Sequence, residues 1–284
     1  MKIAVLGLGL MGMAMATRLQ ATGHRVCGWN RSGGKLPAAE KAGLEASTDA
    51  DIMSNANILV LTLSDAAAIG HSLGHAAPLK DRLVIQMGTI GPDESRAIAS
   101  RVEADGGRYL EAPVLGSIPE ARSGTLIIMA GGRKEDFEAA LPVLDALGTR
   151  PRLVGPTGQG AALKLAMNQL IAGLTTAFSA SLGLVRAEGI ETDLFMALLR
   201  ESALYAPTFD KKLGKMLAHD YARPNFPLKH LLKDTRLFEA AAGASGSDTR
   251  VQAAMASLFE QGVEAGFGDE DYSALYEAVN PRRA

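Results

Sequence analysis

The residues whose types and spacing point most directly to chemistry are Lys164 and Asn168, four positions apart at the start of an apolar stretch. On a helix, residues with this spacing share one face and are one turn apart. An ammonium group can stabilise a developing alkoxide and give it a proton, while an amide can hold a reacting oxygen in place. A lone lysine on a helix is usually a solvated surface residue. Lys164 directly precedes the most apolar stretch in the chain, which makes the pair a candidate for catalysis.

The stretch that must position this pair is predicted to be a long helix. It opens on a glycine-rich entry, is rich in the strong helix formers Ala, Leu and Met, and has no charged residue from 165 to 185. We expect it to begin near Gly160 and to end near Gly189. At roughly 1.5 Å per residue it would span about 40 Å, which is enough to cross a domain interface.

The same stretch is long enough for a membrane-spanning helix, which needs roughly 18 or more apolar residues. Small and polar residues interrupt it, namely Asn168, Gln169, Gly173, Thr175, Thr176, Ser179, Ser181 and Gly183. Such residues suit a closely packed, buried helix better than one that faces lipid. We therefore predict a core helix of a soluble protein and no membrane partner.

The bulk composition is that of an ordinary globular protein. The 284 residues suggest two domains, and 47% hydrophobic residues are enough for full cores. A net charge of −2 offers no electrostatic basis for binding nucleic acid. The single Cys27 excludes an internal disulfide and favours the reducing cytoplasm. His71 and His75 have helix spacing but no acidic neighbour, so we predict no metal site.

The N-terminus carries a dinucleotide-binding fingerprint. A short apolar strand leads into the motif Gly7-Leu8-Gly9-Leu10-Met11-Gly12, and a helix and a second strand, residues 25–30, follow. This strand–turn–helix–strand context turns a weak motif into a specific one. The first glycine permits the tight turn, the second lets a pyrophosphate approach the backbone, and the third lets helix and strand pack closely. The free N–H groups of the helix N-terminus would bind the phosphates.

The end of the second strand predicts which dinucleotide is bound. An NAD site normally places Asp or Glu there, but this chain has Asn30, Arg31 and Ser32. A guanidinium can pair with a 2′-phosphate through two hydrogen bonds, whereas a carboxylate would repel it. The sequence therefore favours NADP, although Arg31 could also be a solvated loop residue.

Further strands alternate with helices up to about residue 157. We predict them at residues 57–63, 82–87, 108–111, 125–130 and 152–154. This rhythm predicts an α/β domain, a doubly wound and mainly parallel Rossmann sheet covered on both faces. Ligands bind at the carboxyl ends of such strands, where we place Leu63 with Ser64, Thr89, and the segment 111–117.

After the long helix the chain reads as all-helical, with helices predicted at 192–203, 207–219, 227–242, 250–265 and 271–279. The predicted domains are therefore a cofactor-binding domain, residues 1–157, and a helical domain, residues 158–284, that begins with the interdomain helix. The long helix is too apolar and too rich in small residues for one small domain to cover. We predict a homodimer or homotetramer.

These motifs together resemble the β-hydroxyacid dehydrogenase family over nearly the whole chain. The resemblance lies in the glycine motif, residues 111–114, residues 158–168 and the Lys233-Asp234 pair. Segments 123–128, 225–230 and 269–272 look most like the glyoxylate and succinic semialdehyde reductase branch. Four separated motifs in the right order make the family resemblance specific.

The resemblance implies roles for individual residues. Lys164 matches the catalytic lysine of the family and Asn168 its substrate-orienting partner, while Thr89 and Lys233 match cofactor contacts. The positions that match the substrate side are Leu115, Gly116, Ser117, Phe226 and Asp234.

The chain departs from the family pattern in the loop that usually reads Asp-Ala-Pro-Val-Ser-Gly-Gly. Glu111, Leu115 and Ser117 occupy its first, fifth and seventh positions. Leu115 removes a hydroxyl that would help to bind a substrate carboxylate, so that task would pass to Ser117 and to backbone N–H groups. Gly88 also stands where a serine is common before Thr89.

The resemblance implies that a nicotinamide delivers hydride to a carbonyl carbon while Lys164 protonates the oxygen. The leading hypothesis is an NADPH-dependent reductase of small aldehyde acids such as glyoxylate or succinic semialdehyde. The alternatives are a 3-hydroxyisobutyrate-type dehydrogenase and an imine reductase. A non-catalytic dinucleotide-binding module is a further alternative, but it would not need Lys164, Asn168 and Asp234 together.

Overall fold

The computed structural model describes residues 1–281 and divides the chain into two compact units, Met1–Leu165 and the part from Ala166 onward. The division falls within the long helix, eight residues after the predicted boundary between residues 157 and 158. The predicted domain ranges stay a prediction.

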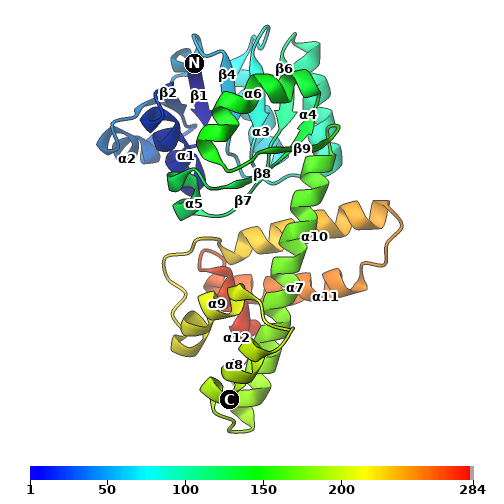
Figure 1. Cartoon of the computed structure of the whole chain (residues 1–284). Coiled ribbons are helices and arrows are strands. Elements are labelled where there is room, and N and C mark those ends of the chain that lie inside the picture. The colour runs from blue at the N-terminus through cyan, green and yellow to red at the C-terminus, as the bar shows by residue number, and fades with distance from the viewer. Residues whose placement is uncertain (282–284) are drawn as a thin grey trace. The chain divides into compact units, whose positions relative to one another are not determined.

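The first unit is built on a nine-stranded sheet (Figure 1). Its order is β3-β2-β1-β4-β5-β6-β8-β7, with β9 paired to β8. The strands β1 to β6 are parallel, and β8 runs antiparallel to β6 and β7. Their bounds are β1 Lys2–Leu6, β2 Arg25–Trp29, β3 Glu45–Ser47, β4 Ile58–Leu61, β5 Leu83–Gln86, β6 Arg108–Glu111, β7 Val114–Leu115, β8 Ile127–Gly132 and β9 Arg152–Gly155.

Helices cover both faces of this sheet, as expected for parallel strands that are apolar on both sides. One core joins the sheet to α1, α5 and α6, and the other joins it to α3 and α4. The strand β4 supplies residues to both cores, because alternate side chains point to opposite faces. The bounds are α1 Leu10–Ala21, η1 Gly33–Lys35, α2 Leu36–Lys41, η2 Ala50–Met53, α3 Ala66–Ala76, α4 Pro92–Ala104, α5 Ile118–Ser123 and α6 Lys134–Leu147. The predicted Rossmann class is confirmed.

The long helix α7 runs over Gln159–Ala187, within one or two residues of the predicted ends. It is long and apolar enough to span a membrane by length and composition, and only 28% of its most apolar window is buried. Within the single chain, the predicted core helix is therefore buried on one face only. Polar residues that are buried on it, Thr175 and Ser179, mark the packed face. Leucines on the other face are exposed.

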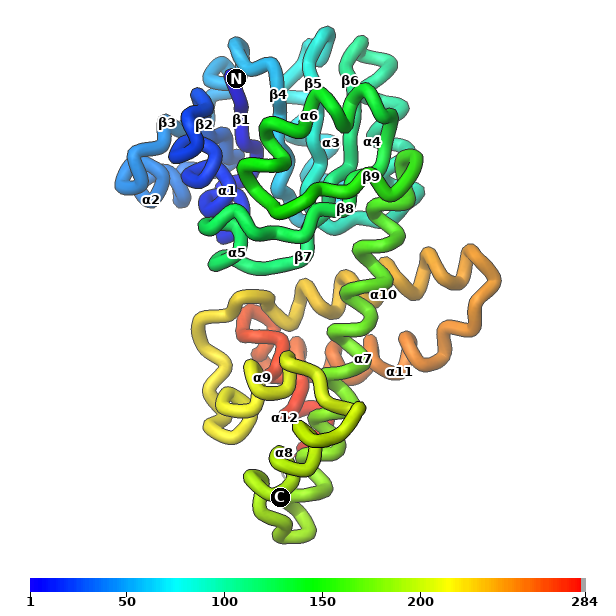
Figure 2. The backbone as a smooth tube through the Cα atoms, in the orientation of Figure 1, coloured from blue at the N-terminus to red at the C-terminus, as the bar shows by residue number. Residues whose placement is uncertain are grey.

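The second unit is all-helical, as predicted, and its helices pack around the later part of α7 (Figure 2). The helices α10 and α11 lie side by side and share a core with Ala172 of α7. A second core joins Phe178 and Leu182 of α7 to α8 and α9. The bounds are α8 Thr192–Glu201, α9 Pro207–Ala218, α10 Leu228–Ala244, α11 Arg250–Gly262, the π-helical η3 Val263–Phe267, η4 Tyr272–Ala274 and α12 Leu275–Val279.

Candidate active site

The glycine motif forms the turn between β1 and α1. Gly7 has φ +96°, a left-handed conformation that favours glycine. A Cβ atom on Gly12 would collide with the carbonyl oxygen of Gly7, whereas a Cβ atom on Gly9 would meet nothing within 4 Å. Gly9 is the N-cap of α1 and no side chain caps this helix. The N–H groups of its first turn can therefore donate hydrogen bonds to a bound anion. These features fit a dinucleotide pyrophosphate.

Thr62 supports this turn from the neighbouring strand. Its Oγ1 donates a 2.6 Å hydrogen bond to the carbonyl oxygen of Gly7. The same oxygen lies where a Cβ atom on Gly12 would be, so the turn, the helix and the end of β4 fit together only around glycine. Thr62 was not among the residues predicted to bind the cofactor. Its place directly before Leu63 and Ser64 was the available signal.

The predicted cofactor-selecting loop follows β2. Asn30 Oδ1 accepts a 3.1 Å hydrogen bond from the N–H of Leu8, and Asn30 Nδ2 donates to the carbonyl oxygen of Ser32 at 2.8 Å. Asn30 therefore ties this loop to the glycine turn. Arg31 and Ser32 are exposed beside it. In this arrangement a guanidinium, and no carboxylate, follows the strand at the position where a ribose 2′-group is selected.

The ends of β4 and β5 lie at the same edge of the sheet. After β4, Ser64 Oγ donates to Asp65, and Asp65 caps α3 by accepting from the N–H of Ala68 at 2.8 Å. After β5, a Cβ atom on Gly88 would collide with the carbonyl oxygen of Leu63. In this chain the backbone after β5 therefore has no room for the side chain of the serine that is common before Thr89 in the family.

The loop after β6 was predicted to bind the substrate. Gly116 has φ +127°, and Ser117 is the N-cap of α5. Both the N–H and the hydroxyl of Ser117 donate to Glu120 Oε2, at 2.8 and 2.9 Å. A carboxylate already accepts from the two donors that were expected to hold a substrate carboxylate. Leu115, half-buried, adds no donor.

Lys164 belongs to the first unit, which also holds the glycine turn. It lies in the second turn of α7 and its exposed fraction is 8%, which is unusual for lysine. Burial of this kind distinguishes it from the solvated lysines of a helix surface. It also places an ammonium group where low dielectric strengthens its effect on a developing negative charge.

The second unit brings Asn168, Lys233 and Asp234 together. Asn168 Nδ2 donates a 2.6 Å hydrogen bond to Asp234 Oδ2, and Lys233 Nζ lies 3.0 Å from Asp234 Oδ1. Asn168 and Asp234 are both buried. The hydrogen bond fixes the orientation of the amide, so that its nitrogen faces Asp234 and its oxygen points elsewhere. The adjacent residues Lys233 and Asp234 were predicted from the resemblance, and the structure links them to Asn168.

Phe226 lies just before α10 in the second unit. Its ring stacks on that of His230, with centroids 6.5 Å apart. Burial is the main cause that lowers the pKa of His230, followed by the positive charge of Lys233. This stacked pair therefore presents a neutral imidazole at neutral pH.

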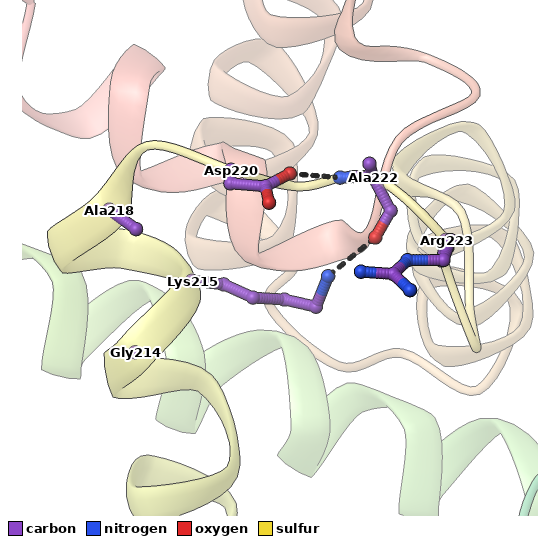
Figure 3. Close-up of a pocket in the computed structure, with 6 residues that line it drawn as sticks. All are labelled: Gly214, Lys215, Ala218, Asp220, Ala222 and Arg223. Carbon is purple, nitrogen blue, oxygen red and sulfur yellow. Dashed lines mark hydrogen bonds between the residues drawn. The ribbon is translucent and has the colours of Figure 1, made fainter.

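A surface pocket elsewhere in the second unit holds none of the predicted site residues (Figure 3). It is formed by α9 and the loop that follows, where Lys215 Nζ donates to the carbonyl oxygen of Ala222 at 2.6 Å. Its lining residues are Gly214, Lys215, Ala218, Asp220, Ala222 and Arg223.

Among the described residues, no group of three His, Cys, Asp or Glu side chains could hold a metal ion.

Comparison with family models gives two matches along the chain. Residues 2–156 match the NAD binding domain of 6-phosphogluconate dehydrogenase. Residues 158–279 match the NAD-binding domain of NADP-dependent 3-hydroxyisobutyrate dehydrogenase.

Comparison with individual proteins gives relatives that span the whole chain. Glyoxylate/succinic semialdehyde reductase 1 of Arabidopsis thaliana is 33% identical, over 98% of each chain. The structure of a 3-hydroxyisobutyrate dehydrogenase from Salmonella typhimurium is 25% identical with a TM-score of 0.86, and the match covers 97% of this chain and 99% of that one. A reductive aminase from Aspergillus terreus, in complex with NADPH and ethyl levulinate, is 26% identical with a TM-score of 0.65, over 97% and 98% of the two chains.

Proposed function

The chain belongs to the β-hydroxyacid dehydrogenase family, and we propose that it is an NADPH-dependent reductase of small aldehyde acids such as glyoxylate or succinic semialdehyde. The observation that carries this proposal is the buried Lys164, in the same compact unit as a glycine turn suited to a dinucleotide. The named activity of the Arabidopsis relative supports the substrate class.

In this mechanism the chain supplies binding groups, a proton and orientation. The glycine turn and the N-terminus of α1 bind the pyrophosphate, and Arg31 binds the 2′-phosphate. Thr89 and Lys233 match two further cofactor contacts of the family. The bound nicotinamide supplies the hydride.

The reacting carbonyl oxygen receives its proton from Lys164 Nζ. Asn168 orients the substrate, and its hydrogen bond to Asp234 holds the amide in one orientation while it does so. Phe226 and the segment Leu115, Gly116 and Ser117 are the proposed substrate-binding residues.

An imine reductase is the second candidate function, and the loop after β6 favours it. Leu115 adds no donor and the donors of Ser117 are bound to Glu120, so this loop offers little to a carboxylate. The likeness to a reductive aminase shows that the fold accommodates such chemistry in another protein. The buried Lys164 favours the aldehyde reductase.

The proposed reaction is tested by initial rates for glyoxylate, succinic semialdehyde, uncharged aldehydes and cyclic imines, each with NADPH and with NADH, and for 3-hydroxyisobutyrate with NADP+ and with NAD+. The highest kcat/KM is expected for an aldehyde acid with NADPH. Oxidation of 3-hydroxyisobutyrate as the fastest reaction would support the oxidative alternative, and a preference for imines would replace the proposal with the second candidate.

The cofactor preference is expected to depend on Arg31. Its replacement by aspartate, Arg31→Asp, removes a partner of the 2′-phosphate and adds a charge that repels it, so the preference for NADPH should flatten or reverse. Dissociation constants for both cofactors, measured by fluorescence titration, check this. The matched control is Lys35→Asp, four positions further along the chain, which should change the preference less. Equal affinity of the unmodified protein for both cofactors would contradict the assignment.

We further propose that the protein is a homodimer or homotetramer. The support is a row of exposed leucines along α7, at 163, 170, 174 and 184, which would leave a large apolar surface in water. Light scattering at micromolar concentration is expected to give at least twice the 29.7 kDa of the chain. A monomeric mass would refute the proposal.

A cytoplasmic location is also part of the proposal. Cys27 is half-buried, and burial followed by the charge of Glu45 raises the pKa of its thiol to about 11. The thiol is therefore protonated and unreactive at neutral pH, which suits a structural cysteine in a reducing compartment.

A further inference from the structure

A buried carboxylate holds the start of α7. Glu111, the last residue of β6, has an exposed fraction of 1%. Its Oε1 accepts hydrogen bonds from the backbone N–H groups of Gly158, Gly160 and Ala161, at 2.8, 2.7 and 3.2 Å. These belong to the first turn of α7 and the residue just before it, whose N–H groups have no acceptor within the helix. One carboxylate oxygen therefore anchors the N-terminus of the helix that carries Lys164.

The other carboxylate oxygen is anchored on a different helix. Ser95 Oγ, on α4, donates to Glu111 Oε2 and lies 2.9 Å from the hydroxyl oxygen of Tyr109. Ser95 and Tyr109 are both buried. Glu111 is therefore held by α4 and β6 on one side and binds α7 on the other, within the first unit.

The surroundings of Glu111 are shaped to admit its side chain. A Cβ atom on Gly131, in β8, would collide with Glu111 Oε1, and one on Gly160 would lie 3.0 Å from it. Both positions are glycine, so the carboxylate can approach the backbone of α7 closely. The arrangement is therefore a fitted contact between a strand end, two glycines and a helix start.

Two opposing effects act on the negative charge of Glu111: the start of α7 stabilises it and burial destabilises it. A carboxylate at a helix N-terminus is stabilised by the positive end of the helix dipole. Burial is the largest influence on the pKa of Glu111 and raises it, while the hydrogen bonds from Ser95 and from the helix N–H groups oppose that rise. Oε1 can accept these hydrogen bonds whether the carboxyl group is ionised or protonated. The contact therefore depends on a side chain long enough to bring this oxygen to the N–H groups of α7.

We propose that Glu111 is a positioning residue of the reductase, because it fixes the first turn of α7 against the sheet and so sets the place of the Lys164 ammonium group. Lys164 lies four residues after Gly160, about 6 Å further along a rigid helix. A rotation or slip of the first turn would therefore move Nζ relative to the cofactor-binding turn of the same unit. The proposal rests on the proposed role of Lys164 as proton donor.

The test is a double-mutant cycle on the full-length protein, with glyoxylate and succinic semialdehyde as substrates and NADPH as cofactor. Glu111→Ala removes the acceptor and is expected to lower kcat by about 10- to 100-fold, since misplacements near 1 Å can have effects of that size. The KM for NADPH should change less than about threefold, because the phosphates are bound at the glycine turn. Glu111→Gln keeps an oxygen of the same reach and should restore most of kcat.

The cycle distinguishes positioning from general destabilisation. If Glu111 acts through Lys164, Glu111→Ala should have almost no further effect on kcat in a Lys164→Ala background. Multiplying effects would overturn the proposal. A near-normal kcat for Lys164→Ala alone would refute the proton-donor role, and with it this proposal. Loss of kcat in Lys164→Ala with normal kcat in Glu111→Ala would refute only the role of Glu111.

A matched control and a second readout accompany the cycle. Asp136 is equally buried, lies in the first turn of α6 and pairs with Arg108 and Arg133. Asp136→Ala should lower thermal stability and leave kcat unchanged. Hydrogen exchange of a peptide covering residues 158–165 should become faster in Glu111→Ala but not in the control. Unchanged exchange there would overturn the anchoring. Should Glu111→Ala fail to fold, Glu111→Met, which is of similar length but has no oxygen to accept from α7, takes its place with the same expectations.

Discussion

Replacement of Lys164 by alanine is expected to lower kcat by a factor on the order of 10² or more, the usual contribution of a general acid. The reason is that no other group is assigned to protonate the alkoxide that forms when hydride reaches the carbonyl carbon. Binding of NADPH should barely change, because its phosphates are assigned to Gly9, Gly12 and Arg31 at the other end of the cofactor. Steady-state kinetics and NADPH titration measure the two effects separately.

The variant Lys164→Arg separates proton donation from charge. Its guanidinium keeps the positive charge but does not release a proton near neutral pH, so it should not restore the rate. If Lys164→Arg were active and Lys164→Ala inactive, the lysine would stabilise charge without donating the proton. Near-normal turnover of Lys164→Ala would remove it from the mechanism altogether.

The largest expected effect on stability comes from an ion pair in the second unit. Lys212 Nζ lies 2.8 Å from both carboxylate oxygens of Asp271, and it also sits 4.2 Å from the ring centre of Tyr272. Asp271 is fully buried. The variant Lys212→Met leaves this carboxylate without its counter-ion, which should lower the free energy of unfolding by about 3–5 kcal/mol. Urea denaturation monitored by circular dichroism measures the change.

Two further variants test the cause of that loss. The double variant Lys212→Met with Asp271→Asn removes the stranded charge yet keeps an oxygen that accepts from Ser273, so it should recover much of the stability. Arg200 pairs with Asp210 at 2.6 Å in an exposed position, and Arg200→Met should have a far smaller effect. A Lys212→Met protein as stable as the parent would show that Asp271 is solvated or protonated without its partner.

Much of the fold could be predicted from local sequence patterns. The glycine motif, the strand 108–111 and the ends of α7 were predicted closely, because each has a strong periodicity or a glycine at its end. The strands β3 and β7 were missed, since two or three residues show no periodicity. The helix α5 was missed although Ser117 and Glu120 have the spacing of a capping box, the signal that could have found it.

The contacts within the site were much harder to predict. Glu111 could be recognised as a departure from a family motif, but the backbone N–H groups that donate to it at the start of α7 are 47 to 50 positions away in sequence. No local pattern encodes that a strand end will meet a helix start. The hydrogen bonds from Ser117 to Glu120 were likewise not predicted, because a serine at a strand end can either cap a helix or bind a ligand.

The three glycines of the dinucleotide motif carry different kinds of information. Gly7 and Gly12 are required by the chain's own backbone and by Thr62, whereas the backbone leaves open space around Gly9. A descendant that lost its cofactor would still keep the first and third glycines under selection for folding, while the second could drift. In an alignment, conservation of the outer two glycines records ancestry of the fold, and only the middle one records continued use of the ligand.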